Sequence, residues 1–309
     1  MSGTSHKTDL LVALIGQQRV PNLIPIKYLQ PHRVLMFHSD YTERVSIVLK
    51  EVLAHGDFNQ QIEVITQCVD PYNIIKAMEM MLSQLNRHGW EPSTTVFNIT
   101  GGTKPMAIAA CNIARVSGAK IAYLNNESPD IELYSYVFGQ RGDIRLEESH
   151  AVSNLISIID YLDIHVGPRR YKVEGFSKAA GGAFEKAVYE AVEGSVDETL
   201  AGVNVENGVE IDLVVRCGNR VGIAEVKTGS GATKKHPIEQ LVIATERDVL
   251  GRYTSRFLII DRRMIAEELR DLAAARGIEL IELPSFEETG CISEDDKSLL
   301  RERILNKLR

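Results

Sequence analysis

Cysteine is scarce in this sequence, and its few positions are widely separated. Cys68, Cys111, Cys217 and Cys291 are the only four in 309 residues, and none of them forms a Cys-x-x-Cys pair. A structural zinc site or a disulfide framework needs clustered or regularly spaced cysteines, so this spacing argues against both. We expect four reduced thiols that serve packing.

Long apolar runs and an excess of basic charge are also missing. No stretch approaches the ~20 apolar residues of a membrane-spanning helix, and Met1 to Asp9 lacks the charged-then-apolar order of a signal peptide. We therefore expect a cytoplasmic protein with no membrane partner. The formal net charge is −7. A contact with nucleic acid would have to depend on local basic patches and bound cations.

The remaining composition is that of an ordinary globular protein, with 44% hydrophobic and 25% charged residues. A chain of 309 residues is long for one domain. We predict a first domain over 1–150, a connecting segment over 151–170 and a second domain over 171–309.

The first domain alternates short apolar runs with amphipathic stretches. Such alternation predicts a parallel, doubly wound α/β sheet, in which ligands bind beyond the carboxyl ends of the strands. The expected strands are 10–15, 34–37, 62–66, 95–99 and 120–124, and the expected helices are 21–28, 41–54, 71–85 and 105–116.

One loop of this domain has the composition of an anion site. Thr100-Gly101-Gly102-Thr103-Lys104 follows an expected strand and opens an expected helix. The glycines allow a close backbone approach, and the helix N-terminus and Lys104 offer positive charge to an anion. The loop matches neither the P-loop pattern nor Gly-x-Gly-x-x-Gly. A purely structural role, in which the glycines only join strand to helix, remains open at this point.

The second domain contains a predicted hairpin with charged residues at one end. Period-two alternation places Glu210 and Asp212 on one face of a strand and Glu225 and Lys227 on one face of the next. A turn at 217–219 joins the two strands. Pairing would therefore bring two carboxylates and one ammonium together. The alternative from these residues alone is an exposed cross-strand pair of little energetic weight.

The spacing of these charges resembles the PD-(D/E)xK nuclease superfamily. That family carries Asp on one strand and (Glu or Asp)-x-Lys on the next, here Asp212, Glu225 and Lys227, while Ile211 replaces its namesake proline. The resemblance implies a restriction-endonuclease-like α/β domain and a catalytic metal, Mn²⁺ or Mg²⁺. It also implies a helix glutamate and an auxiliary glutamine. The implied catalytic residues are Asp212, Glu225, Lys227, Glu185 and Gln240, and the implied metal ligands are Asp212, Glu225, Val226 through its carbonyl, and Glu185.

The first domain is similar to the CARF sensor domains of type III CRISPR proteins. The shared pattern is Asn-x-Thr-Gly-Gly-Thr-Lys-x-Met at 98–106. A Rossmann-like CARF domain joined to a PD-(D/E)xK domain resembles the cyclic-oligoadenylate-activated nucleases. The resemblance implies a homodimer that binds one cyclic oligoadenylate, most often the tetra-adenylate, and then cuts RNA or DNA in antiviral defence. The implied ligand-binding residues are Thr100, Gly101, Gly102, Thr103 and Lys104, with Gln17, Gln18, His38 and Ser39 as less specific matches.

Two other readings of the sequence remain open. A constitutive restriction or repair nuclease would have a first domain that senses nothing, and a non-enzymatic sensor would have a degenerate nuclease fold. The intact Asp212, Glu225 and Lys227 argue against the second of these, and the 100–104 loop argues against the first.

Overall fold

The protein is described from a computed structural model that covers residues 8–55, 61–126, 131–177, 181–206, 208–232, 234–246, 249–263 and 266–308. Residues 1–7 lie outside these ranges. They are part of the N-terminal segment, Met1 to Asp9, for which the sequence predicts no signal peptide. The chain divides into two compact units, one ending at Leu155 and the other beginning at Ile156. No helix among the described residues is long and apolar enough to cross a membrane.

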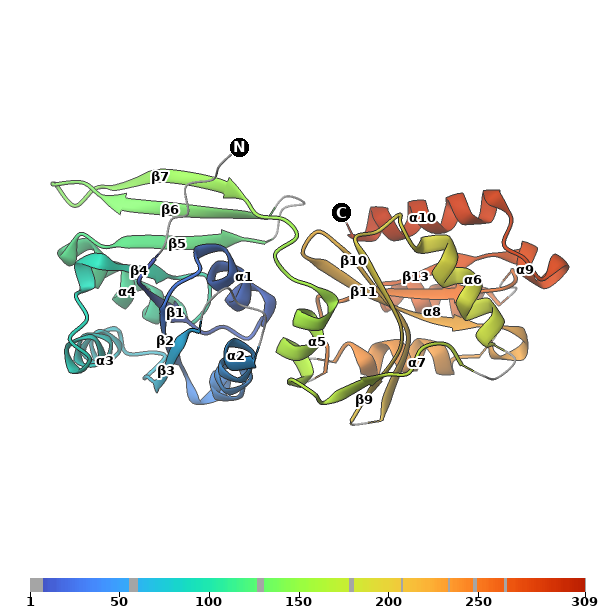
Figure 1. The fold of residues 1–309 in the computed structure, drawn as a ribbon, viewed down its shortest axis with the longest axis horizontal. Helices are drawn as coiled ribbons and strands as arrows, with labels where there is room; N and C mark the ends of the chain where they lie inside the picture. Colours follow the sequence, from blue (N-terminus) through green and yellow to red (C-terminus); the bar gives the residue numbers. More distant parts are fainter. Residues whose placement is uncertain are drawn as a thin grey trace. The chain divides into compact units, whose positions relative to one another are not determined.

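The first unit contains a seven-stranded sheet of order β3-β2-β1-β4-β5-β6-β7 (Figure 1). The five strands from β3 to β5 are parallel, and β6 and β7 are antiparallel additions at one edge. The strands are β1 Leu10–Leu14, β2 Arg33–His38, β3 Glu63–Cys68, β4 Thr95–Asn98, β5 Lys120–Asn125, β6 Glu132–Phe138 and β7 Ile144–Ala151. The α-helices of this unit are α1 Val20–Leu29, α2 Glu43–His55, α3 Ile74–Arg87 and α4 Lys104–Ser117.

Both faces of this sheet are covered by helices, as the sequence predicts. Helices α3 and α4 pack together on a core that includes Val12, Phe37 and Phe97. Helices α1 and α2 contact the strands of the same sheet. Because β2 and β4 flank β1 on opposite sides, the winding direction reverses between β1 and β4. Ligands of doubly wound sheets bind at this point of reversal.

The predicted start of helix α3 at Pro71 is wrong. The Asp70 carboxylate accepts the N–H groups of Tyr72 and Asn73, and this holds a turn ahead of the helix. The Asn73 side chain then caps the helix by accepting the Lys76 N–H, so α3 begins at Ile74. Asp and Asn favour such local bonds over a helical continuation.

The second unit contains a six-stranded sheet of order β13-β12-β11-β10-β9-β8 (Figure 1). Strands β8 to β11 are antiparallel, and β12 and β13 join β11 in parallel. Its strands are β8 Tyr171–Val173, β9 Glu198–Val205, β10 Val209–Cys217, β11 Arg220–Lys227, β12 Ser255–Ile260 and β13 Ile278–Glu282. Its α-helices are α5 Ile158–Val166, α6 Gly182–Val192, α7 His236–Ala244, α8 Glu267–Ala275, α9 Pro284–Thr289 and α10 Glu294–Leu308.

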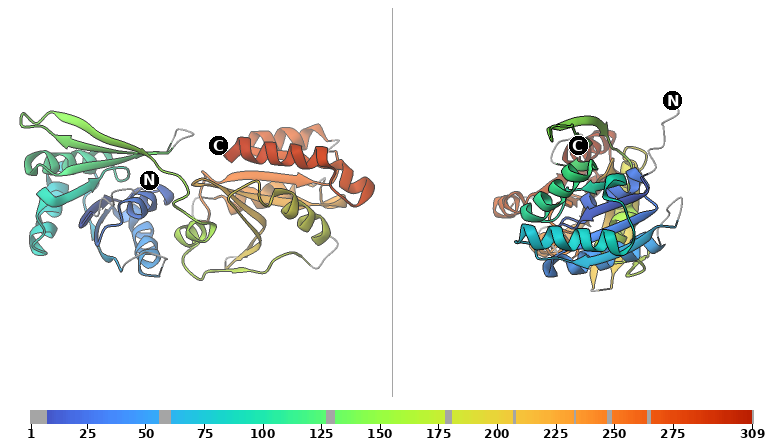
Figure 2. Two further views of the ribbon diagram at one scale, coloured as in Figure 1. Left: turned by 45° about the horizontal axis from the view of Figure 1, so that its top comes forward. Right: turned by 90° about the vertical axis from the view of Figure 1, so that its left-hand side faces the viewer.

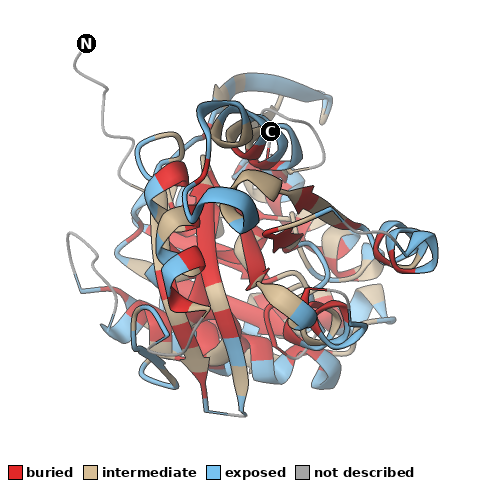
Figure 3. Cartoon of the chain, turned by 90° about the vertical axis from the view of Figure 1, so that its right-hand side faces the viewer, coloured by how far each residue is buried: buried red, intermediate tan, exposed pale blue. Residues whose placement is uncertain are grey.

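The two faces of this sheet are covered by different helices. Helices α6 and α10 share a core with Leu213, Ala224 and Val226, so these residues point to their side. Neighbouring side chains of a strand point to opposite faces, so Glu225 and Lys227 face the other side. Helix α7 contacts β10, β11 and β12. In Figure 3 the buried residues follow the strands, while the helices carry exposed stretches.

Helix α10 lies in a C-terminal segment rich in charged residues, yet one of its faces is buried. Leu300, Ile304 and Leu308 are fully buried in the core of the second unit. Their spacing of four residues forms one apolar stripe in a helix that is otherwise charged. Figure 2 shows α10 running alongside the sheet.

Candidate functional site

The structure brings Asp212, Glu225 and Lys227 together at the open end of the β10–β11 hairpin. The pairing runs from Cys217 opposite Arg220 to Leu213 opposite Ala224. Beyond that point the Asp212 Oδ2 accepts the Val226 N–H at 2.8 Å. The Lys227 Nζ lies 2.6 Å from Asp212 Oδ2 and 2.6 Å from Glu225 Oε2. One ammonium therefore faces two carboxylates.

Burial changes the protonation of this cluster. The Glu225 side chain is only 2% exposed. The pKa of the Glu225 carboxyl is raised to about 8, first by burial and then by the charge of Asp212, while Lys227 opposes the rise. Burial lowers the pKa of Lys227, but Glu225 and Asp212 raise it by more, so the ammonium is held in its charged form. The cluster can therefore hold or release one proton near neutral pH at Glu225.

The two carboxylates are candidate ligands for a divalent cation. Glu225 Oε2 is buried and accepts no aligned hydrogen bond from the described residues, although the Lys227 ammonium lies close to it. A buried carboxylate without enough positive charge is costly, and oxygen donors suit Mg²⁺ or Mn²⁺. Among the described residues, no group of three His, Cys, Asp or Glu side chains is arranged to hold a metal. Asp212 and Glu225 are thus the two side chains that could hold a cation here.

Glu185 and Gln240, the two further catalytic residues that the resemblance implies, have different surroundings in the structure. The Glu185 carboxylate, in the first turn of α6, accepts the Ser177 N–H at 3.0 Å, and no contact joins it to Asp212 or Glu225 among the described residues. Gln240 lies on α7, the helix that packs on β11. Its Oε1 is buried and has no hydrogen-bond partner in the part of the chain that is described. The roles of Glu185, Gln240 and the Val226 carbonyl stay predictions.

The glycine-rich loop of the first unit lies at the point where the sheet reverses its winding. A Cβ on Gly101 would lie 2.2 Å from the Leu14 carbonyl oxygen, and a Cβ on Gly102 would lie 2.9 Å from the Leu14 Cβ. Gly102 has a φ of +73°, which favours glycine. The loop can therefore approach β1 this closely only with glycine at 101.

The polar residues of the same loop fix its shape. Thr100 Oγ1 donates to Asn98 Oδ1 and accepts the Leu124 N–H. Thr103 accepts the Met106 N–H as the cap of α4, and its hydroxyl donates to the Pro71 carbonyl. Lys104 is exposed at the start of the helix. A shaped loop, a helix N-terminus and an exposed ammonium together can receive an anion.

The sequence also predicts four less specific ligand-binding residues, and the structure divides them into an accessible pair and a buried pair. Gln17 is exposed after β1, and Gln18 accepts a hydrogen bond from Asn126 through Oε1. His38 and Ser39 are buried at 5% and 7% exposure, and the Ser39 side chain lies in a capping box with Thr42. Burial leaves little of His38 or Ser39 for a ligand. Sequence position at a strand end does not reveal this burial.

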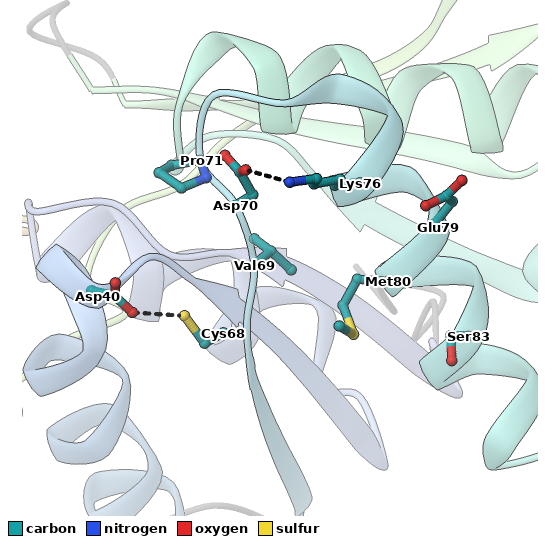
Figure 4. A pocket seen from close by; sticks show the side chains of 9 residues that line it. All are labelled: Asp40, Cys68, Val69, Asp70, Pro71, Lys76, Glu79, Met80 and Ser83. Carbon is teal, nitrogen blue, oxygen red and sulfur yellow. Dashed lines mark hydrogen bonds and ion pairs between the residues drawn. The ribbon is translucent and has the colours of Figure 1, made fainter.

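A cavity of about 650 Å³ lies elsewhere in the first unit, beside the end of β3 (Figure 4). Cys68 Sγ donates to Asp40 Oδ1 at 3.1 Å in its wall. Burial, and then the hydrogen bond to Asp40, raise the pKa of the Cys68 thiol to about 11. A thiol that stays protonated is a poor nucleophile. The lining residues are Asp40, Cys68, Val69, Asp70, Pro71, Lys76, Glu79, Met80 and Ser83.

Two residues beside the sites were not anticipated from the sequence. Asn22 accepts the Gly16 N–H and donates to the Gly16 and Gln18 carbonyls, so it holds the loop after β1. Asp261 follows β12 and lies next to Lys227. A polar residue directly after an apolar parallel strand is the signal that would have pointed to Asp261, because such residues gather at one sheet edge.

Comparison with known proteins identifies the first unit. Residues 10–161 match the family model of the Card1 CARF domain. This part of the chain is therefore a CARF domain of the Card1 kind. No curated protein sequence matches the chain.

Solved structures with the same fold extend over both units. Can2 from Sulfobacillus thermosulfidooxidans, solved with cyclic tetra-adenylate, has 16% identity and a TM-score of 0.71 over 97% of this chain and 99% of its own. Protein VC1899 from Vibrio cholerae has 14% identity and a TM-score of 0.67 over 96% and 97%. A type III CRISPR defence DNA nuclease activated by cyclic oligoadenylate has 16% identity and a TM-score of 0.56 over 87% and 52%. The predicted fold class, two α/β domains of which the first is Rossmann-like, is confirmed.

Proposed function

We propose that the protein is a metal-dependent nuclease of the PD-(D/E)xK type, activated by a cyclic oligoadenylate in type III CRISPR defence. The observation that carries the proposal is the joining of two features in one chain. One is a CARF domain, and the other is a second unit in which Asp212, Glu225 and Lys227 meet at the end of a hairpin. The likeness to Can2 with cyclic tetra-adenylate supports the tetra-adenylate as the activator.

Phosphodiester hydrolysis requires an activated water and compensation of negative charge on the phosphate. Lys227, which lies beside both carboxylates, would position this water and offset the developing charge. Asp212 accepts hydrogen bonds from the Lys227 ammonium and the Val226 N–H, and these two bonds would hold Lys227 in place at the end of the hairpin. The pKa of Glu225 is raised in the metal-free cluster, so this carboxyl would have to lose its proton before it binds a cation.

Mn²⁺ or Mg²⁺ would be held by Asp212 and Glu225. Such a cation supplies Lewis-acid polarisation of the phosphate and a bound water that loses its proton more easily. The Val226 carbonyl and, through water, Glu185 would complete the oxygen ligands. In the metal-free cluster, the Lys227 ammonium compensates part of the negative charge.

The activator would bind at the 100–104 loop. Each phosphate of the ring carries one negative charge, which the α4 N-terminus and Lys104 would receive. A two-fold ring fits a homodimer in which each protomer offers the same loop to half of the ligand. Gln17 and Gln18 lie at the adjacent strand end and would contact the ribose or base.

Cleavage assays test this function directly. Labelled RNA, single-stranded DNA and supercoiled duplex are incubated with the protein and Mn²⁺, with and without cyclic tri-, tetra- and hexa-adenylate. We expect cleavage only with one of the rings present. Equal cleavage without any ring would favour a constitutive nuclease, and ring binding without cleavage of any substrate would favour a non-enzymatic sensor.

A further inference from the structure

Asp261 lies beside Lys227, and the proposed chemistry leaves it without a role. It follows β12 directly and is 5% exposed. Strands β11 and β12 are parallel, and Lys227 stands opposite Ile260 in their register. The carboxyl ends of the two strands meet at one edge of the sheet, so Asp261 reaches the chain just beyond Lys227.

Asp261 holds the chain on both sides of Thr228. Its backbone N–H donates to the Lys227 carbonyl oxygen at 3.4 Å, and its Oδ2 accepts the Gly229 N–H at 3.2 Å. Gly229 has a φ of +59°, so the chain turns sharply at this residue. The turn that leaves Lys227 is therefore tied to one carboxylate.

Arg262 donates hydrogen bonds to both oxygens of the Asp261 carboxylate. Its Nε lies 2.8 Å from Asp261 Oδ1, and its Nη2 lies 3.3 Å from Oδ2. Its Nη1 pairs with Glu287 Oε1 on α9 at 3.1 Å. Both oxygens of Asp261 are thus engaged by donors, which makes this carboxylate a poor metal ligand. Its contacts are those of a group that holds backbone in place.

We propose that Asp261 is a positioning residue that sets the place of Lys227 against Asp212 and Glu225; this rests on the nuclease function proposed above. The Lys227 Nζ lies 2.6 Å from both carboxylates, and a shift of the backbone at Lys227 would change both distances. Loss of the bond to Gly229 frees the turn and lets this backbone shift. A shift of about 1 Å at a reacting group can lower turnover about 100-fold.

The test compares Asp261→Ala with Asp261→Asn in the full chain, with cyclic tetra-adenylate, Mn²⁺ and the nucleic acid that the wild type cuts. The asparagine oxygen can still accept the Gly229 N–H. We expect Asp261→Ala to lower kcat by about tenfold to 100-fold, with KM and Mn²⁺ affinity within about twofold of wild type. Asp261→Asn should restore most of kcat. Glu287→Ala, which removes only the outer partner of Arg262, is the matched control and should keep the wild-type kcat.

A second measurement does not depend on activity. Amide hydrogen exchange over 227–231 should speed up in Asp261→Ala and stay slow in Asp261→Asn. Wild-type kcat and unchanged exchange in Asp261→Ala would overturn the inference, as would a loss of Mn²⁺ affinity in Asp261→Asn, which would make Asp261 part of the metal site. If wild type cuts nothing, the proposed function fails, and the exchange data still decide whether Asp261 holds the turn.

Discussion

Two carboxylates share one ammonium at the end of the β10–β11 hairpin, and water is largely excluded from one of them. Asp212 already receives the Val226 N–H and the Lys227 ammonium. Glu225 is more deeply buried, and the Lys227 ammonium offsets only part of the cost of its negative charge. The pKa of Glu225 therefore rises to about 8. Because a carboxylate must lose its proton to bind a cation, metal affinity should increase up to about that pH.

The raised pKa of Glu225 predicts a pH-dependent stability of the metal-free protein. Its pKa is about 8 in the folded state and 4.5 as an unperturbed group, so between these values the folded state binds more protons than the unfolded state. The free energy of unfolding should therefore fall as the pH rises through this window, by on the order of 1 kcal/mol per pH unit. Urea unfolding in EDTA at a series of pH values measures it, with Glu225→Gln as the variant. A slope equal in both proteins would contradict the assignment.

Removal of single side chains should separate metal binding from turnover. Asp212→Ala or Glu225→Ala should abolish cleavage and Mn²⁺ binding while nucleotide binding stays intact, because the cation loses one of its two direct carboxylate ligands. Lys227→Ala should bind Mn²⁺ and lose turnover. Calorimetry with Mn²⁺ and cleavage assays check this, with Glu210→Ala, an exposed carboxylate of the same strand, as the control. Full activity of Asp212→Ala, or of wild type in excess EDTA, would refute the site.

At the scale of elements, the loop between β4 and α4 is held to β1 by sterics. Gly102 and Gly118 bracket helix α4 and have nearly equal φ values of +73° and +74°. The two glycines differ in the room available for a side chain. A Cβ on Gly102 would lie 2.9 Å from the Leu14 Cβ, whereas a Cβ on Gly118 would have no non-neighbouring atom within 4 Å among the described residues. Comparing substitutions at the two glycines therefore distinguishes the cost of backbone strain from the cost of steric crowding.

Alanine at these two glycines should destabilise the protein unequally. Gly118→Ala should cost about 1–2 kcal/mol, the penalty of a left-handed conformation alone. Gly102→Ala should cost about 1–3 kcal/mol more, because the added methyl crowds the Leu14 side chain. Denaturant unfolding of both variants measures the difference. Equal losses would mean that the loop relaxes away from β1 without cost.

At the scale of the whole molecule, the proposed function requires the two units to influence each other. A nucleotide bound in the first unit can activate the second only if it prefers the active arrangement, since equal affinity for both arrangements shifts nothing. Lys104 is the exposed charge at the expected phosphate site.

Lys104→Ala should weaken nucleotide binding and activated cleavage together, with any basal cleavage unchanged. The loss of a charge-assisted hydrogen bond costs about 1.5–3 kcal/mol per site, and a homodimer would contribute two sites. Calorimetry and a cleavage titration on the same variant measure both effects. Lys50→Ala, an exposed lysine of α2, serves as the control. If Lys104→Ala bound the ring as tightly as wild type, the sensor site would have to be sought elsewhere.

The strands that are buried on one or both faces could be predicted from the sequence. Leu10–Leu14, Val209–Cys217 and Arg220–Lys227 are apolar or alternate with period two, and this periodicity follows from burial itself. Strand β7 was missed because its mostly exposed residues carry no such pattern. The buried stripe of α10 was missed because charged residues dominate the helix around it.

The sequence by itself determined which side chains the two candidate sites can offer, because period two and helix caps explain the spacing of the glycines, threonines, lysines and carboxylates. Only the tertiary structure decided which of those residues meet. It placed the Lys227 Nζ 2.6 Å from both carboxylates, joined Glu185 to Ser177 and buried His38. It also brought Asp261 to Lys227 from 34 positions later in the chain. The physical reason is that contacts across a sheet depend on strand order and register, which local sequence patterns do not encode.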